Sequence, residues 1–116
     1  MHLILSPIEK MQSDGLSPND ITFTCTLKAC GLTNAIARGK LIHAEIVNWG
    51  LLEKNIKLGN ALVDMYAKCG LLAKAYKVLK ELPVRDAISW TSLISGYAQG
   101  GQINEAIQYF VEMLRE

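Results

Sequence analysis

The segment Asn60-Ala-Leu-Val-Asp-Met-Tyr-Ala-Lys-Cys-Gly70 decides the fold, because the chain carries it again as Thr91-Ser-Leu-Ile-Ser-Gly-Tyr-Ala-Gln-Gly-Gly101. The two copies are 31 residues apart, and a leucine, a Tyr-Ala pair and the final glycine occupy the same places in both. A looser third copy, Thr24-Cys-Thr-Leu-Lys-Ala-Cys-Gly31, lies upstream. A period of about 20 to 50 residues is typical of repeat architectures.

Each copy carries the apolar spacing of a helix, with apolar side chains at positions i, i+3, i+4 and i+7. In the second copy these are Leu62, Met65, Tyr66 and Cys69. A further apolar segment, residues 73–82, follows and is repeated as residues 104–113. Gly70 is suited to end the first helix, and Pro83 ends the second because proline lacks a backbone N–H. Each unit is therefore predicted to be a helix–turn–helix that buries its apolar face by stacking, in an all-α solenoid.

The chain is predicted to begin and end inside repeats. Residues Leu3–Asp14 have the pattern of a second helix without its first, with Pro7 expected to kink it, and a turn over residues 15–19 follows. The last unit stops at Glu116, before a closing loop. Because a solenoid needs polar caps at both ends and neither end has one, we interpret the chain as a piece of a longer array or a truncated gene product.

Composition limits the class of protein. Half of the 116 residues are hydrophobic and 7% are aromatic, which favours helices over a sandwich of short strands. The formal net charge of +1 gives little support to tight polyanion binding by this piece alone. Three cysteines without a framework spacing favour a reducing compartment. No apolar run is long enough to span a membrane, and no targeting peptide is recognisable.

The repeats resemble the plant pentatricopeptide repeat (PPR) family in its PLS arrangement, where units of slightly different length alternate. The long, L-type unit is indicated by Gly39-Lys-Leu-Ile-His-Ala44 and the short, S-type unit by Asp64-Met-Tyr-Ala-Lys-Cys-Gly70. The resemblance implies a right-handed α-solenoid of stacked helix–turn–helix repeats. Its units are a partial repeat over residues 1–19, an L-type repeat over 20–55, an S-type repeat over 56–86 and a truncated P-type repeat over 87–116.

The resemblance further implies a sequence-selective module for single-stranded RNA that reads about one base per repeat. In this family the fifth and last residues of a repeat contact the base, and the second residue packs between neighbouring bases. By motif match the fifth residues are Thr24, Asn60 and Thr91, the last residues are Asn19, Asn55 and Asp86, and the second residues are Ile21, Lys57 and Ile88.

The family also implies a place of action, in plant mitochondria or chloroplasts. There such a protein guides factors of RNA editing or processing. The resemblance implies no catalytic residue, no cofactor and no metal, and neither a membrane nor a small-molecule substrate as partner.

The chemistry of these residues agrees with base reading. Each second residue lies three before the fifth, so the two share one helix face. An Asn amide offers donors and an acceptor, whereas an Asp carboxylate only accepts. Asn60 with Asp86 suits a pyrimidine whose ring N–H must be accepted, which in this family favours uracil over cytosine. By the same family pattern Thr24 with Asn55 is expected to favour adenine. Lys57 departs from the usual aliphatic residue and is predicted to contact a phosphate.

Other interpretations compete with base reading. Asn and Asp are common helix caps, which is the alternative role for Asn60 and Asp86. A helical scaffold for a protein partner is the alternative function for the whole chain. His43-Ala-Glu45 matches the H-x-E of zinc deaminases, but the P-C-x-x-C that completes their site is absent from the sequence.

The cysteines and tyrosines are assigned to the core rather than to chemistry. Cys30 and Cys69 end equivalent first helices and are predicted to be small core residues. Tyr66 and Tyr97 lie on the apolar face, where core packing is favoured over stacking on bases. Trp49 and Trp90 are further candidates for base stacking, and the lysines at 68, 74, 77 and 80 are expected to be solvated helix charges.

Overall fold

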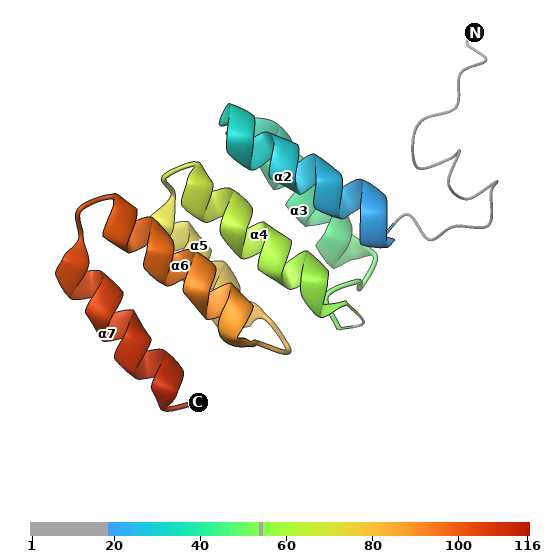
Figure 1. Cartoon of the computed structure of the whole chain (residues 1–116). Coiled ribbons are helices and arrows are strands. Elements are labelled where there is room, and N and C mark those ends of the chain that lie inside the picture. The colour runs from blue at the N-terminus through green and yellow to red at the C-terminus, as the bar shows by residue number, and fades with distance from the viewer. Residues whose placement is uncertain (1–18, 54) are drawn as a thin grey trace, which may run out of the picture.

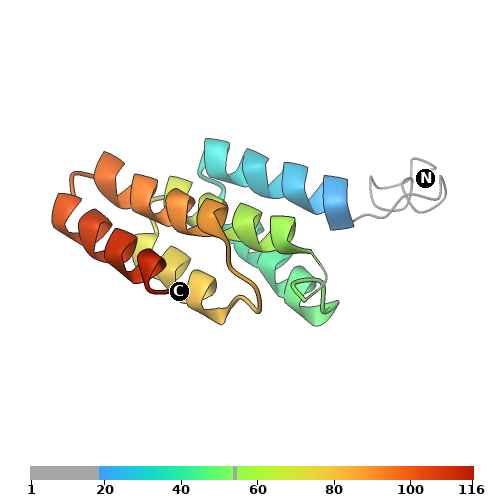
Figure 2. The ribbon, with the colours of Figure 1, turned by 60° about the horizontal axis from the view of Figure 1, so that its bottom comes forward.

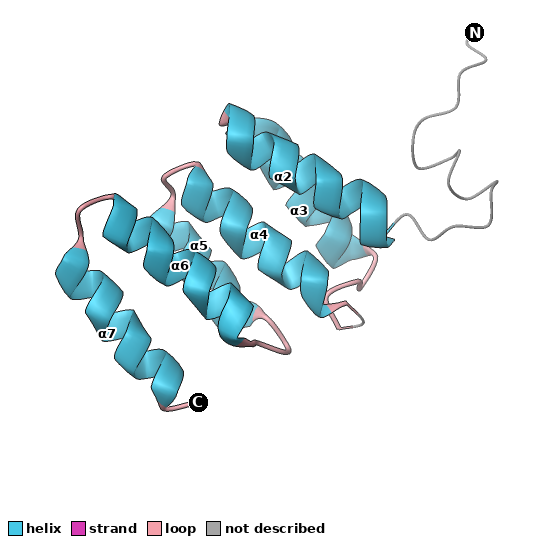
Figure 3. Ribbon diagram, in the orientation of Figure 1, coloured by secondary structure: helices cyan, strands magenta, loops and turns pink. Residues whose placement is uncertain are grey.

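The structure is a computed structural model that describes residues 19–53 and 55–116. These residues form helices and connecting loops, with no strand among them (Figures 1 and 3). The elements are η1 (Asn19–Phe23), α2 (Thr24–Thr33), α3 (Ile36–Asn48), α4 (Ile56–Lys68), α5 (Leu72–Glu81), α6 (Ala87–Gln99) and α7 (Ile103–Leu114). The helix expected over Leu3–Asp14, with the kink at Pro7, lies outside the described residues. The π-helical turn η1 runs directly into α2, so Asn19 begins a helix here and not a loop.

The helices pair into three hairpins that stack in two layers. The first helices lie side by side, with α4 packed between α2 and α6, and form what we call the first layer. The second helices, α3, α5 and α7, lie behind them and form the second layer, as the turned view in Figure 2 shows. The prediction of an all-helical solenoid built from helix–turn–helix units is therefore confirmed.

Each hairpin turns through one residue in the left-handed conformation. Asn34, Gly70 and Gly101 have φ angles of 59°, 79° and 80°. In the middle hairpin the N–H of Leu71 donates to the carbonyl of Tyr66 at 2.9 Å, which satisfies an acceptor that the end of α4 leaves free. Gly70 thus ends the first helix as predicted, and α5 ends two residues before Pro83.

The core lies between the two layers and between successive first helices. Tyr66 and Tyr97 are 1% and 7% exposed, which confirms that they pack in the core. Cys30 is buried, and the Cys69 Sγ lies 3.7 Å from the Cys30 carbonyl oxygen, so both fill space between α2 and α4. Trp90 is buried as well, and each fully buried large apolar side chain contributes about 1.5–3 kcal/mol.

A glycine on α6 permits close packing of the hairpins. A Cβ atom on Gly96 would lie 2.8 Å from the Leu72 Cδ2 and 3.2 Å from the Ala67 Cβ. Rotation of the Leu72 side chain would relieve the first contact, whereas the contact with Ala67 would require α6 to move a few tenths of an ångström away from α4. Gly96 thus permits the close approach of these two first helices.

Candidate nucleic-acid interface

The open face of the first layer carries a groove that runs across α2, α4 and α6. It consists of two adjoining hollows of about 260 and 330 Å³. Asp64, Lys68, Ile88 and Ser92 line both hollows, so the two are continuous. We call this surface the first-layer groove. It includes five of the predicted base-reading residues, which are Thr24, Lys57, Asn60, Ile88 and Thr91.

The fifth residues of the repeats differ in how their polar atoms are bonded. The Thr24 Oγ1 and the Asn60 Oδ1 are both buried, and neither has a hydrogen-bond partner among the residues that the structure describes. The Thr91 hydroxyl instead donates to the Ala87 carbonyl one turn earlier, at 2.6 Å. Because buried polar atoms in proteins are nearly always hydrogen-bonded, the two unpaired atoms are unusual.

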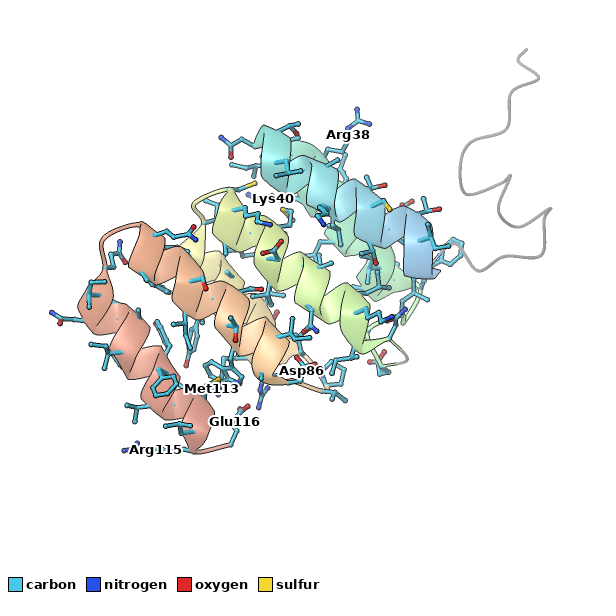
Figure 4. All side chains as sticks on the ribbon, in the orientation of Figure 1. Arg38, Lys40, Asp86, Met113, Arg115 and Glu116 are labelled. Atoms are coloured by element: carbon cyan, nitrogen blue, oxygen red, sulfur yellow. The ribbon has the colours of Figure 1, made fainter. Side chains whose placement is uncertain are left out.

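The last residues of the repeats cap the helices that follow them. The Asn55 Oδ1 accepts from the Lys57 N–H at 3.0 Å at the start of α4. The Asp86 Oδ1 accepts from the N–H groups of Ile88 and Ser89 at 3.0 and 3.1 Å at the start of α6, where Figure 4 labels it. Ser89 completes a capping box, since its Oγ accepts from the Asp86 N–H at 3.2 Å. The capping role considered for Asp86 is therefore present, whereas Asn60 lies inside α4 and caps nothing.

One carboxylate oxygen of Asp86 does the capping and the other is unused. The Oδ2 atom accepts no hydrogen bond from the described residues. A carboxylate held at one oxygen by two backbone donors keeps its orientation fixed, while its second oxygen remains an acceptor. The side chain of Asn19, the remaining predicted last residue, lies outside the described part of the structure.

The second residues of the repeats stand at the exposed starts of the first helices. Ile21 and Ile88 are 53% and 61% exposed, which is unusual for isoleucine beside a well-packed core. Lys57 occupies the same place on α4 and is exposed too. At the starts of the three hairpins, apolar, basic and apolar side chains thus follow one another from η1 through α4 to α6.

Lysines outnumber carboxylates on the first-layer groove. Lys28, Lys57 and Lys68 line it together with a single acid, Asp64. The Lys68 Nζ pairs with the Asp64 Oδ2 at 2.9 Å, whereas Lys28 and Lys57 form no ion pair with the described residues. Two unpaired ammonium groups therefore face the groove of a chain that is nearly neutral overall.

Sequence reasoning missed several residues of the groove, although a signal for some of them existed. Lys28, Asp64, Ser92 and Ser95 each lie four residues after a predicted reading residue, namely Thr24, Asn60, Ile88 and Thr91. Residues four apart share a helix face, so each of these residues follows from its partner by helical spacing.

The H-x-E segment lies away from this groove, in the second layer. The His43 Nδ1 is 2.9 Å from the Tyr66 hydroxyl, across the boundary between the first two hairpins. Burial lowers the pKa of His43 below its ordinary value, and nearby Lys74 lowers the pKa further. Within residues 19–53 and 55–116 no three His, Cys, Asp or Glu side chains gather as metal ligands would. That same part of the chain contains no helix long and apolar enough to cross a bilayer.

The family model and the relatives that match this chain all carry pentatricopeptide repeats. A family model described as PPR repeat matches residues 60–86 and 88–116. A chloroplastic pentatricopeptide repeat-containing protein of Arabidopsis thaliana is 41% identical over 106 residues, which is 91% of this chain and 17% of that protein. A mitochondrial protein of the same name and organism is 34% identical over 112 residues, 97% of this chain and 18% of its own length. This chain spans less than a fifth of these relatives.

Proposed function

Because this chain belongs to the pentatricopeptide repeat family, we propose that it binds single-stranded RNA along the first-layer groove and selects bases there. In this role it is a guide without chemistry of its own, which positions the factors that edit or process an organellar transcript. The relatives named as chloroplastic or mitochondrial support a place of action in one of these organelles.

The two unpaired buried atoms of the groove carry this proposal. The Thr24 Oγ1 and the Asn60 Oδ1 have no hydrogen-bond partner within residues 19–53 and 55–116. A buried polar atom without a partner costs about 1–3 kcal/mol. A base edge entering the groove can remove this cost after a small side-chain rotation. The two residues stand at the same position of successive repeats, as a reader of successive bases requires.

The exposed starts of the first helices supply the remaining contacts with RNA. Ile21 and Ile88 offer apolar surfaces against which the faces of bases can pack. Lys57, between them, and Lys28, one turn beyond Thr24, offer ammonium groups that form no ion pair with the described residues and are available for the phosphates. Apolar faces and lysines in alternation match the alternation of base and phosphate along a single strand.

Asp86 is proposed to select uracil together with Asn60. Its Oδ1 holds the start of α6, and its Oδ2 is an acceptor for the N3–H of uracil. Cytosine presents a lone pair at N3, which repels a carboxylate. The corresponding last residue of the preceding repeat, Asn55, offers an amide and is proposed to favour adenine together with Thr24.

The repeat limits proposed from the sequence agree with the hairpins. The hairpins α2–α3, α4–α5 and α6–α7 fall within residues 20–55, 56–86 and 87–116. We propose these as L-type, S-type and P-type repeats, with residues 1–19 as part of a preceding repeat and Asn19 as its base-reading last residue.

The substitution Asp86→Asn tests base reading without loss of the helix cap, since Asn caps about as well as Asp. We expect the wild-type chain to prefer oligouridylate over oligocytidylate. In the variant the new amide donates to the N3 of cytosine, so the ratio of the two dissociation constants should shift toward cytosine by about tenfold, given about 1–3 kcal/mol for a base contact. Fluorescence anisotropy with labelled oligonucleotides measures both constants.

Asp64→Asn is the matched control, because it makes the same change of charge at a residue that lines the groove and is not among the proposed base readers. It should tighten binding of both oligonucleotides slightly and leave their ratio unchanged. Affinity of the wild type should fall as salt concentration rises. Equal base ratios in the two variants would contradict the role of Asp86, and no binding to either oligonucleotide at low salt would contradict RNA binding by this chain.

A further inference from the structure

A second hollow lies on the other side of the molecule, between the second helices of the first two hairpins. It has a volume of about 570 Å³ and is bounded by α3, the start of α5 and the edge of Tyr66. We call it the second-layer crevice. Its polar lining consists of Lys40, His43, Asn48, Tyr66 and Lys74, and its apolar lining consists of Ala44, Val47 and Leu71.

The lining of this crevice is basic. It includes two lysines and a histidine but no carboxylate. Neither Lys40 nor Lys74 forms an ion pair with the described residues, and the Lys74 Nζ lies 5.9 Å from the centre of the Tyr66 ring. Lys40 belongs to α3 and Lys74 to α5, so the two ammonium groups approach the crevice from opposite walls. A concave site with donors on both walls favours an anionic group.

His43 and Tyr66 supply further polar atoms at the inner end of the crevice. Their hydrogen bond, 2.9 Å between Nδ1 and the hydroxyl oxygen, fixes the orientation of the imidazole ring. When the tyrosine donates to Nδ1, the neutral ring carries its proton on Nε2 and keeps one donor for a ligand. His43 is half-buried, and Tyr66 is almost fully buried.

The next boundary along the chain is closed by a carboxylate. Between α5 and α7 the Glu112 carboxylate accepts from the Tyr76 hydroxyl at 3.0 Å and from the Lys80 Nζ at 3.1 Å. The counterpart of Glu112 in α5 is Glu81, which lies in a neighbouring hollow with His43 and forms no ion pair with the described residues. The crevice itself is therefore left without a carboxylate among its lining residues.

We propose that the second-layer crevice binds a glutamate or aspartate side chain of an acidic segment in a protein partner. Lys40 and Lys74 hold the carboxylate from both walls, His43 and Asn48 donate to its remaining lone pairs, and Val47 and Leu71 contact the aliphatic part of the partner. A carboxylate is favoured over an RNA phosphate because the proposed path of RNA lies in the other layer. This inference is independent of RNA binding in the first-layer groove.

The test uses the full chain and a short fluorescein-labelled peptide of alternating glutamate and alanine. The same peptide with glutamine in place of glutamate is the control ligand. We expect Lys74→Gln and Lys40→Gln each to weaken binding of the acidic peptide roughly fivefold, the effect of a charged contact worth about 1 kcal/mol. The matched control is Lys77→Gln, which removes the same charge from an exposed position of α5 outside the crevice and should change the dissociation constant less than twofold.

A second measurement, by NMR, tests whether the acidic peptide binds in the second-layer crevice. The chain has two histidines, so one substitution variant assigns the imidazole signals of His43 by NMR. Addition of the acidic peptide should shift them, and the glutamine peptide should not. If Lys77→Gln weakens the peptide as much as Lys74→Gln, or if the His43 signals stay in place, the proposal is wrong. It is wrong as well if oligouridylate shifts these signals and the acidic peptide does not, since the crevice would then bind RNA phosphates.

Discussion

The two boundaries between hairpins differ most in the second layer. Between α5 and α7 the Tyr109 ring packs between those of Tyr76 and Tyr97, at centroid distances of 4.7 and 5.0 Å. Charged pairs close the same boundary, with Arg85 bound to Glu116 at 2.6 Å. Between α3 and α5 no hydrogen bond or ion pair joins the described side chains, and the second-layer crevice stays open. The same repeat pattern thus forms one boundary whose second layer is closed by side-chain contacts and one whose second layer is open.

The difference between the boundaries suggests which repeat positions hold the hairpins together and which are available to bind a partner. In the first layer the buried Leu62 and Tyr66 of α4 recur as Leu93 and Tyr97 of α6, and Cys30 of α2, at the place of the tyrosines, is buried too. In the second layer some places keep a buried apolar residue, as Ile42 and Val78 do, and others are exchanged. His43 in α3 corresponds to Leu79 in α5, which is fully buried. Stability therefore comes mainly from the shared positions, and the exchanged positions are available for binding.

Opening the closed boundary should have the largest effect. Tyr109→Ala removes the ring between Tyr76 and Tyr97 and should lower the free energy of unfolding by about 2–3 kcal/mol, a little less than for a fully buried aromatic residue. Urea unfolding followed by circular dichroism measures the change. Ile107→Ala on the same helix is the control, because Ile107 is 57% exposed and its loss should cost well under 1 kcal/mol. Equal effects of the two substitutions would mean that the ring cluster does not close this boundary.

Closing the open boundary should have an intermediate effect that depends on Tyr66. His43→Leu gives α3 the residue that α5 has at the same place, but it leaves the Tyr66 hydroxyl buried without a partner. We expect a net loss of about 1 kcal/mol, since the unpaired hydroxyl costs about 1–3 kcal/mol and the leucine offsets part of this. The double variant with Tyr66→Phe should recover at least wild-type stability. A double-mutant cycle by urea unfolding gives the coupling, and additive effects would show that the 2.9 Å contact contributes nothing.

The smallest effect should be a difference in pH dependence between the boundaries. Burial lowers the pKa of His43 from 6.5, so the unfolded chain binds the proton more readily, and this contribution to stability is lost as pH falls below about 6.5. Hydrogen bonds from Arg85 lower the pKa of Glu116 from 4.5, so its contribution is lost only as pH falls below about 4.5. Thermal unfolding measured at a series of pH values should show two falls in stability as pH decreases. Each fall should correspond to less than about 1 kcal/mol in the free energy of unfolding. The step near pH 6.5 should be absent from the His43→Leu/Tyr66→Phe variant, and its persistence there would exclude His43 as the cause.

The sequence was sufficient for the fold because the fold depends on a repeated pattern. The spacing of Leu62, Met65 and Tyr66 predicted a buried helix face, and Gly70 and Pro83 predicted where the helices end. The conformation at the start of α2 was not predictable in this way. Residues 15–19 have the composition of a turn, yet Asn19 begins a π-helical turn that continues into α2.

The candidate sites were predictable only in part, since they depend on contacts between repeats. Helical spacing placed Thr24, Asn60 and Thr91 on one surface, but it did not show that the first two lack hydrogen-bond partners and the third has one. The second-layer crevice was not predicted at all. Its walls come from α3 and α5, and the sequence does not show how far apart these helices lie or that no carboxylate bridges them.

The double duty of Asp86 has a consequence for engineering these repeats. Its side chain ends one repeat, but the N–H groups of Ile88 and Ser89 that orient it belong to the next. A graft joined between Asp86 and Ala87 transplants the proposed specificity residue and leaves its support behind. Modules should instead be exchanged within α6, beyond Ser89, so that Asp86 and the first turn that orients it are transferred together.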